Sequence, residues 1–275
     1  MKKVLVLMIV LAALMTAAAG VSAQQAPALL FVITGQSNAG QQGAAGQLTP
    51  AQRTAVDGAR YYAPQHTNKQ QVVALQPYGG AFGVELSFGR RVRELCPGRE
   101  VLIAKNYSGG TSIIAWDETA PNSFWNWEMA QVGNEGKPAM YPRVMKLRTD
   151  AAAALGQPVT LAGVLYIQVE RDSKESYGAQ RYERNLRELI AALRRDWTTP
   201  ALPVVFIDSH TNLTGNGPLV HDAVVAVADG VPWTEWVPVR DLAKKPDRVH
   251  FATAGVWTLG ERLAEAWFRQ AGGCN

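Results

Sequence analysis

A serine directly after an apolar run is the first residue of the chain with a chemical use. Residues 29–33 are apolar, and the run ends in the polar sequence TGQSN, whose serine is Ser37. At the end of a strand, loop amides point at the space beside such a hydroxyl, where negative charge develops during acyl transfer. Ser37 is therefore either a loop residue or a nucleophile. A nucleophile also needs a base and a carboxylate that orients the base.

The best-placed base among the four histidines is His250. Asp247 precedes it by three residues in the sequence DRVH, so one turn presents both side chains. The carboxylate can then hold one ring nitrogen while the other faces a serine. The alternative base is His210, which follows a predicted strand. His66 and His221 lie in polar, irregular sequence and are interpreted as surface residues.

Two glycines in the sequence NYSGGTSIIAW add a third element. Gly109 and Gly110 follow an apolar run, and glycine permits a positive φ or a close approach of the backbone to a ligand. A backbone N–H at this place can donate to an oxyanion. The alternative is an ordinary tight turn.

Alternating strand and helix patterns must position these residues. Four apolar, β-branched runs are typical of strands covered on both faces, and amphipathic helical patterns lie between them. The predicted strands are 29–34, 101–104, 161–168 and 203–208, and the predicted helices are 84–95, 141–155, 181–197 and 253–271. The pattern predicts an α/β fold, a three-layer α/β/α sandwich with a mainly parallel central sheet. The irregular segments 41–83 and 116–141 are expected to build its binding face.

The N-terminus has the pattern of a secretory signal peptide. Lys2 and Lys3 precede the uncharged apolar run 4–19, and residues 21–23, VSA, offer small side chains before a cleavage site. We expect residues 1–23 to be removed and the protein to be secreted or periplasmic. The alternative is a membrane anchor, but the run is shorter than the about 20 residues that span a bilayer. No membrane span is expected after cleavage.

The composition predicts neither a nucleic-acid partner nor a metal site. The formal net charge is +4 without a Lys/Arg cluster, so no nucleic-acid partner is expected. The two cysteines are Cys96 and Cys274, and a disulfide and two free thiols are both open alternatives in an exported protein. Because the sequence has no C-x-x-C, no metal site is expected.

Five motifs occur together and in order along the chain. They read GQSNAG, GVELSFGRRV, GGTSIIAW, IQVERDS and DRVHF, the last followed by LGERLAEA. In combination they resemble the SGNH-hydrolase superfamily, and more closely its sialate O-acetylesterase and acetylxylan esterase branch of carbohydrate acetylesterases. The resemblance spans nearly all of residues 24–275. It implies a single SGNH-type esterase domain with a flavodoxin-like sheet.

The resemblance also implies a role for each matching residue. The nucleophile, the base and the orienting carboxylate would be Ser37, His250 and Asp247. The donors of the oxyanion hole would be the Ser37 amide, an amide of Gly109 or Gly110, and the Gln168 side chain. The supporting residues would be Gln36, Asn38 and Glu170.

The motif IQVERDS departs from the family pattern. The family reads Gln-Gly-Glu-Ser-Asp where this chain has QVERD, residues 168–172. We expect Val169 to narrow the acyl site and slow the enzyme or, if its φ is positive, to strain the backbone as well. Arg171 replaces the serine. Glu170 and Asp172 would suit a glycosidase pair, but two carboxylates at i and i+2 of one strand favour a structural role.

Two other functions are alternatives to a serine esterase. An α/β-hydrolase lipase would place G-x-S-x-G well inside the chain, whereas Ser37 lies near the mature N-terminus. A non-catalytic or weakly active glycan-binding protein would stack sugars on tryptophans. At least half of the candidates are expected in the core; they are Trp116, Trp125, Trp127, Trp233 and Trp236.

The sequence therefore predicts a secreted serine esterase that removes O-acetyl groups from carbohydrates by a Ser-His-Asp acyl-enzyme mechanism. The mechanism needs no metal or organic cofactor. The expected partner is an acetylated carbohydrate. The identity of the sugar and the oligomeric state stay open.

Overall fold

The computed structural model describes residues 26–66, 70–211 and 213–274. The predicted signal peptide, residues 1–23, lies outside them. Within the described residues, no helix combines the length and the apolarity that a bilayer span requires.

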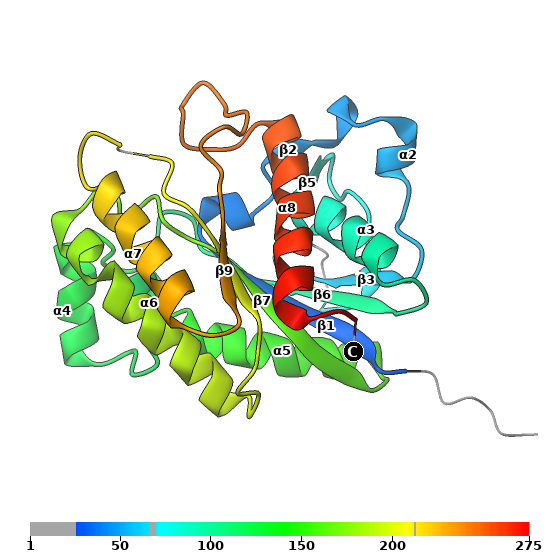
Figure 1. Ribbon diagram of the computed structural model, residues 1–275, viewed down its shortest axis with the longest axis horizontal. Helices are drawn as coiled ribbons and strands as arrows, with labels where there is room; N and C mark the ends of the chain where they lie inside the picture. The colour runs from blue at the N-terminus through cyan, green and yellow to red at the C-terminus, as the bar shows by residue number, and fades with distance from the viewer. Residues whose placement is uncertain (1–25, 67–69, 212, 275) are drawn as a thin grey trace, which may run out of the picture.

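Seven strands form the central sheet (Figure 1). In spatial order they are β4 (Val73–Ala74), β3 (Ala59–Tyr62), β6 (Val101–Lys105), β1 (Ala28–Gly35), β7 (Val159–Ile167), β8 (Val204–Ile207) and β9 (Thr234–Val237). Only the edge strand β4 runs antiparallel to its neighbour, and every other pair is parallel. A separate two-stranded ribbon pairs β2 (Gly43–Ala44) with β5 (Ala81–Phe82).

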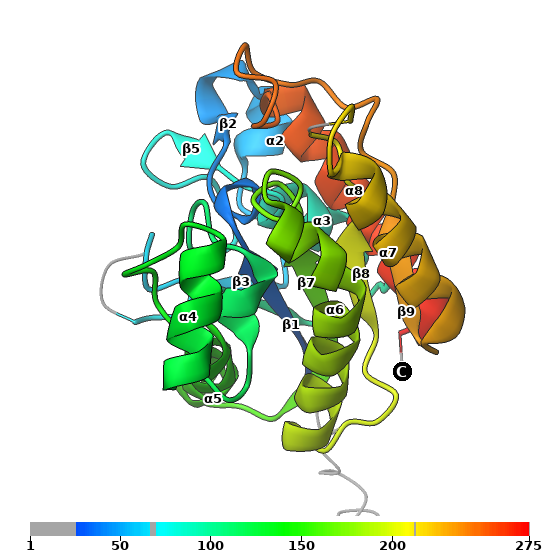
Figure 2. The same cartoon turned by 90° about the vertical axis from the view of Figure 1, so that its left-hand side faces the viewer.

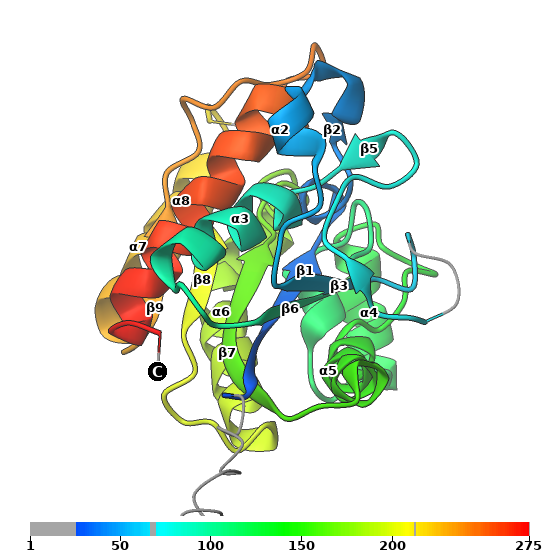
Figure 3. The ribbon, with the colours of Figure 1, turned by 90° about the vertical axis from the view of Figure 1, so that its right-hand side faces the viewer.

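Helices cover both faces of this sheet. On one face α3 (Glu85–Leu95) packs beside α8 (Thr253–Ala271), and α5 (Tyr141–Leu155) and α6 (Ser176–Asp196) cover the other (Figures 1 and 3). Smaller or peripheral helices are α2 (Pro50–Arg53), α4 (Ser123–Gln131), α7 (Gly217–Gly230) and the 3-10 turns η1 (Ser37–Ala39), η2 (Ala45–Gln47) and η3 (Ile113–Trp116). The predicted three-layer α/β/α sandwich is thus confirmed.

The sequence of the central strand β1 is apolar without alternation. All of its residues are buried, because helices cover the sheet on both faces. Phe31 packs edge-on against Phe88 of α3 and Trp267 of α8, with ring centroids 4.9 and 4.7 Å apart. The Trp267 indole also donates to the Ala162 carbonyl of β7. This contact fixes the last helix against the strands that lead to the site.

The predicted elements agree with the structure where the sequence has a long apolar run or a long amphipathic pattern. The four predicted strands and four predicted helices all form, and the helices predicted at 141–155 and 253–271 have those bounds. The segment expected to be irregular between 41 and 83 contains β3, a full member of the central sheet. The segment 116–141 contains α4, and the pattern missed α7 and β9 as well.

The alternative left open for the cysteines is resolved in favour of a disulfide. Cys96 ends α3, Cys274 follows α8, and their Cα atoms are 5.6 Å apart. The bond ties together the ends of the two helices that cover the same face of the sheet.

Candidate active site

Ser37 stands where β1 ends. Gly35 has a φ of +142°, and a Cβ at this position would lie 2.0 Å from the Ile167 carbonyl oxygen of β7. Only glycine fits there, because both the dihedral and the neighbouring strand exclude a side chain. The Gln36 amide then donates to the same carbonyl at 3.0 Å, and Ser37 begins the short turn η1. The strand end therefore holds a half-buried serine at the carboxyl edge of the sheet.

A histidine and an aspartate lie in line with this serine. The distance from His250 Nε2 to Ser37 Oγ is 2.9 Å, and the distance from His250 Nδ1 to Asp247 Oδ2 is 2.8 Å. The other carboxylate oxygen of Asp247 accepts from the amides of Val249 and His250, each at 2.9 Å. The hydrogen bond from the His250 side chain, followed by those from the two amides, lowers the pKa of Asp247 well below its usual range.

Asn38 joins the serine turn to the histidine loop. Its amide nitrogen donates to the Val249 carbonyl at 3.0 Å, and its oxygen accepts from the Phe251 amide at 3.1 Å. Asn38 thus forms hydrogen bonds with the backbone on both sides of His250. The same nitrogen also donates to the buried carboxylate of Glu170. The structure thus places Asn38 and Glu170, two of the three predicted supporting residues, directly behind the serine and the histidine.

His210 does not reach Ser37. It is buried, and its Nε2 donates to the Val249 carbonyl at 3.0 Å and lies 3.6 Å from Glu170 Oε1. The structure therefore pairs Ser37 with His250 rather than with the alternative base, and His210 packs behind the loop that carries His250.

The hollow in front of Ser37 has a volume of about 340 Å³. Its walls are formed by Gln36, Ser37, Gly109, Gly110, Glu170, Arg171, Lys174, Val249 and His250. Gly109 lies close to the serine, since a Cβ on it would be 3.8 Å from Ser37 Cβ. Its carbonyl accepts from the Lys137 ammonium at 2.8 Å, which fixes the glycine loop from its outer side.

Gln168 does not face this hollow, contrary to the expectation that its side chain donates to an oxyanion. The side chain is fully buried, and its Nε2 donates to Gln36 Oε1 at 3.1 Å, to the Thr111 carbonyl at 2.6 Å and to Asp172 Oδ2 at 2.8 Å. With its donors occupied, Gln168 braces Gln36 and the glycine loop from behind. Gln36 Oε1 also accepts from the Arg171 amide at 3.1 Å.

Val169 does not narrow the acyl site, and that expectation is wrong. Val169 is fully buried in the core and is absent from the walls of the hollow. The described residues other than glycine with a positive φ are Gln70, Thr198, Trp233 and Arg248, so no such strain arises at Val169.

The other departure from the family pattern, Arg171 in place of serine, does line the hollow. Its Nε donates to the Val132 carbonyl at 2.8 Å, and one terminal nitrogen donates to the Gly133 carbonyl at 2.9 Å.

Glu170 and Asp172 serve different parts of the site. Glu170 faces Asn38, whereas Asp172 accepts from the Ser112 hydroxyl and from the Ile113 amide, the latter at 3.0 Å. Burial raises the pKa of Asp172 to about 6, and its hydrogen bonds oppose that rise. Asp172 is not among the walls of the hollow. The two carboxylates therefore do not face one substrate, which argues against a glycosidase pair.

The two histidines interpreted as surface residues are half-buried and paired. His66 lies between the hydroxyls of Tyr61 and Tyr107, at 3.1 and 3.2 Å, and burial lowers its pKa to about 4. His221 Nδ1 lies 2.6 Å from Asp208 Oδ1. Both side chains are thus only partly exposed, because each has partners that the polar sequence around it does not reveal.

The tryptophans divide between core and surface. Trp116 and Trp125 are buried, Trp236 is half-buried, and Trp127 and Trp233 are about half exposed, at 51% and 45%. Within the described residues, no group of three or more His, Cys, Asp or Glu side chains is placed to hold a metal ion.

Comparison with known proteins places this geometry in context. A family model described as carbohydrate esterase, sialic acid-specific acetylesterase, matches residues 27–269. A probable carbohydrate esterase of Arabidopsis thaliana is 28% identical over 162 residues, which cover 58% of this chain and 52% of the relative. The matched region thus spans about half the length of that relative.

Three solved structures share the fold. An Arabidopsis thaliana protein superimposes with a TM-score of 0.69 at 20% identity, over 89% of this chain and 99% of that chain. A carbohydrate acetylesterase from Xanthomonas citri gives a TM-score of 0.65 at 20% identity, over 88% of this chain and 56% of its own. NanS gives 0.63 at 15% identity, over 89% and 98%.

Proposed function

Because the chain belongs to the carbohydrate esterase, sialic acid-specific acetylesterase family, we propose that it is a secreted serine esterase that removes O-acetyl groups from carbohydrates. Residues 24–275 form one esterase domain in this proposal, after removal of the leader. The observation that carries the proposal is the continuous contact from Asp247 through His250 to Ser37 Oγ, beside a hollow that is open to a substrate.

Acylation begins with the proton of Ser37. Asp247 holds the His250 ring with a proton on Nδ1, so Nε2 is free to accept the serine proton. The Ser37 oxygen then attacks the acetyl carbonyl and forms a tetrahedral intermediate. His250 returns the proton to the departing sugar oxygen as the ester bond breaks. The products of this half-reaction are the free sugar hydroxyl and an acetyl group on Ser37.

Deacylation repeats these steps with water in place of the serine. His250 takes a proton from the water, the resulting hydroxide attacks the acetyl-serine, and the proton passes to Ser37 Oγ as acetate leaves. The strongly lowered pKa of Asp247 keeps its carboxylate charged during the cycle. That charge stabilises the imidazolium that forms in each half-reaction.

The oxyanion donors in this proposal are backbone amides. The Ser37 amide and an amide of Gly109 or Gly110 border the hollow next to the nucleophile. Gln168 is left out, because its side-chain donors are engaged elsewhere. Gln168 instead donates hydrogen bonds to Gln36 and to the Thr111 carbonyl. These bonds position the two segments that carry the oxyanion-donor amides. Preorganised donors of this kind supply a large part of the rate enhancement in acyl transfer.

The test is hydrolysis of 4-nitrophenyl acetate and release of acetate from acetylated xylan, O-acetyl sialic acid and acetylated pectin. We expect the wild-type chain to hydrolyse the small ester and to release acetate from at least one glycan. Absence of both activities in a folded wild-type protein would instead favour the non-catalytic glycan-binding alternative.

A further inference from the structure

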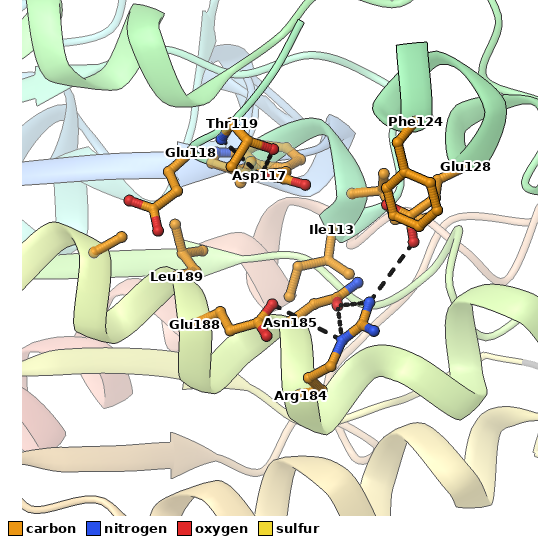
Figure 4. A pocket seen from close by; sticks show the side chains of 13 residues that line it. Ile113, Asp117, Glu118, Thr119, Phe124, Glu128, Arg184, Asn185, Glu188 and Leu189 are labelled. Carbon is orange, nitrogen blue, oxygen red and sulfur yellow. Dashed lines mark hydrogen bonds and ion pairs between the residues drawn. The ribbon is translucent and has the colours of Figure 1, made fainter. Parts of the chain in front are cut away.

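A second cavity lies on α4 and α6, apart from Ser37 and His250. Its volume is about 390 Å³, within the range of about 300–1,000 Å³ that ligand pockets occupy. Its walls come from η3, the segment after it, α4 and α6. Figure 4 shows Glu118 and Phe124 on opposite sides of the space, with Ile113 between them. We call this space the α4–α6 cavity.

Carboxylates dominate the polar wall of the α4–α6 cavity. Asp117, Glu118, Glu128 and Glu188 line it, whereas Arg184 is the one cation among its walls and Arg195, outside them, pairs with Glu118. The Arg184 guanidinium lies 3.6 Å from Glu128 and 3.8 Å from Glu188. This excess of negative charge opposes an anionic ligand, whereas hydroxyl groups donate well to carboxylate oxygens. The charge pattern favours a neutral, hydroxyl-rich ligand.

Glu128 is the most deeply buried of these carboxylates. Its side chain is 4% exposed, and its Oε1 accepts from the Tyr177 hydroxyl at 2.9 Å. A carboxylate accepts several hydrogen bonds, so a hydroxyl of a ligand in the cavity can donate to Glu128 as well.

An aromatic surface borders the α4–α6 cavity. Phe124 and Trp127, three residues apart on α4, are 59% and 51% exposed, and their rings stack with centroids 5.8 Å apart. Trp127 also meets the Tyr177 ring edge-on at 5.6 Å. Exposed and adjacent aromatic rings offer flat faces of negative electrostatic potential. The C–H faces of pyranose rings are complementary to them.

This surface adjoins the hollow at Ser37. Arg171 and Lys174 line that hollow, and Tyr177 follows them at the start of α6. The Arg171 guanidinium donates to the Val132 and Gly133 carbonyls at the end of α4. Figure 2 shows α4 and α6 side by side. A sugar chain with one residue at Ser37 therefore passes Arg171 and Lys174 on its way to Trp127.

We propose that the α4–α6 cavity and the rings of Phe124 and Trp127 bind neutral pyranose residues of a polysaccharide whose acetyl group lies at Ser37. The inference rests on the proposed esterase function and deepens it, because it makes the substrate an extended neutral glycan rather than a single sugar. The aromatic rings supply stacking, and Glu128 and Glu188 accept from the sugar hydroxyls.

The test is calorimetric binding of oligosaccharides to the Ser37→Ala chain, which cannot consume an ester. The probes are xylohexaose and mannohexaose as neutral chains and hexagalacturonate as the anionic one. We expect at least one neutral hexamer to bind and hexagalacturonate to bind more weakly. Trp127→Ala, and separately Phe124→Ala, should weaken binding of the neutral hexamer about tenfold or more. Both residues are exposed, so the variants should fold.

The matched control is Trp233→Ala, which removes a similarly exposed tryptophan outside the cavity and should leave binding unchanged. The proposal is overturned if no neutral hexamer binds, if hexagalacturonate binds best, or if both Trp127→Ala and Phe124→Ala bind as well as their parent. Failure of the esterase proposal looks different: the wild-type chain would bind the hexamer yet release no acetate.

Discussion

At the scale of the residue, the site depends on which histidine meets Ser37. His250 contacts both Ser37 and Asp247, whereas His210 contacts the backbone of Val249, the Glu170 carboxylate and the Phe251 ring. We expect His250→Ala to lower kcat for 4-nitrophenyl acetate by about 10⁴-fold. His210→Ala should cost about tenfold or less, because Asn38 still holds the loop on both sides of His250. A larger loss in His210→Ala than in His250→Ala would contradict this arrangement.

Val169 is the second test at this scale. Because its side chain is buried in the core and away from the hollow, Val169→Gly should leave kcat/KM unchanged for acetyl esters. It should lower the free energy of unfolding by about 2–4 kcal/mol, through the lost packing and the greater freedom of glycine in the unfolded chain. Denaturant unfolding and steady-state kinetics on the same preparation check both parts. Val169→Ala separates the packing loss from the glycine effect, and a rise in kcat/KM would show that this position limits the chemistry.

The sequence predicted which residues the structure brings together better than it predicted where their side chains point. Ser37, Asp247 and His250 lie in contact as expected, because motif and spacing place them at the ends of predicted elements. Gln168 was misplaced because the sequence does not tell whether a side chain after a strand faces the solvent or the protein interior. Lys174 was not singled out, and Lys137 was not connected to the glycine loop, since neither carries a local pattern.

At the scale of the element, the ends of β1 and β7 set the position of Ser37. The long apolar strands and the amphipathic helices were readable because burial on both faces or on one helical face leaves a strong pattern. The short strand β3, with the sequence ARYY, carries no such signal and reaches the sheet only through pairing with β6. Strand β9, TEWV, is only partly buried and was missed for the same reason.

The disulfide is the element-scale feature with the clearest consequence for stability. It links α3 to the end of α8 across a sequence separation of 178 residues. Closing so long a loop restricts the unfolded chain, which stabilises the fold by about 3–5 kcal/mol. We expect the Cys96→Ser/Cys274→Ser double variant to unfold at clearly lower denaturant than the wild type. Addition of a thiol reductant should shift the wild type in the same direction but leave the double variant unchanged, and equal midpoints for the two proteins would contradict this role.

At the scale of the whole molecule, two adjoining surfaces serve one substrate in our account. The hollow at Ser37 carries the chemistry, and the α4–α6 cavity with Phe124 and Trp127 holds the neighbouring sugars. The segment 116–141 was expected to build part of the binding face, and it supplies both exposed rings. Within the segment 41–83, the described residues 41–66 and 70–83 contribute no wall to either cavity. Of the two segments that the sequence offered for a binding face, our account thus uses 116–141.

The central claim is that Ser37 is the nucleophile of an acetylesterase, and the most direct test compares acetate release by the wild type and Ser37→Ala. Both proteins should have the same circular dichroism spectrum and unfolding midpoint, because the serine hydroxyl lies at a half-buried site outside the core. Our account predicts acetate release by the wild type and a loss of about 10⁴-fold or more in kcat for Ser37→Ala. Turnover by Ser37→Ala close to that of the wild type would contradict the account.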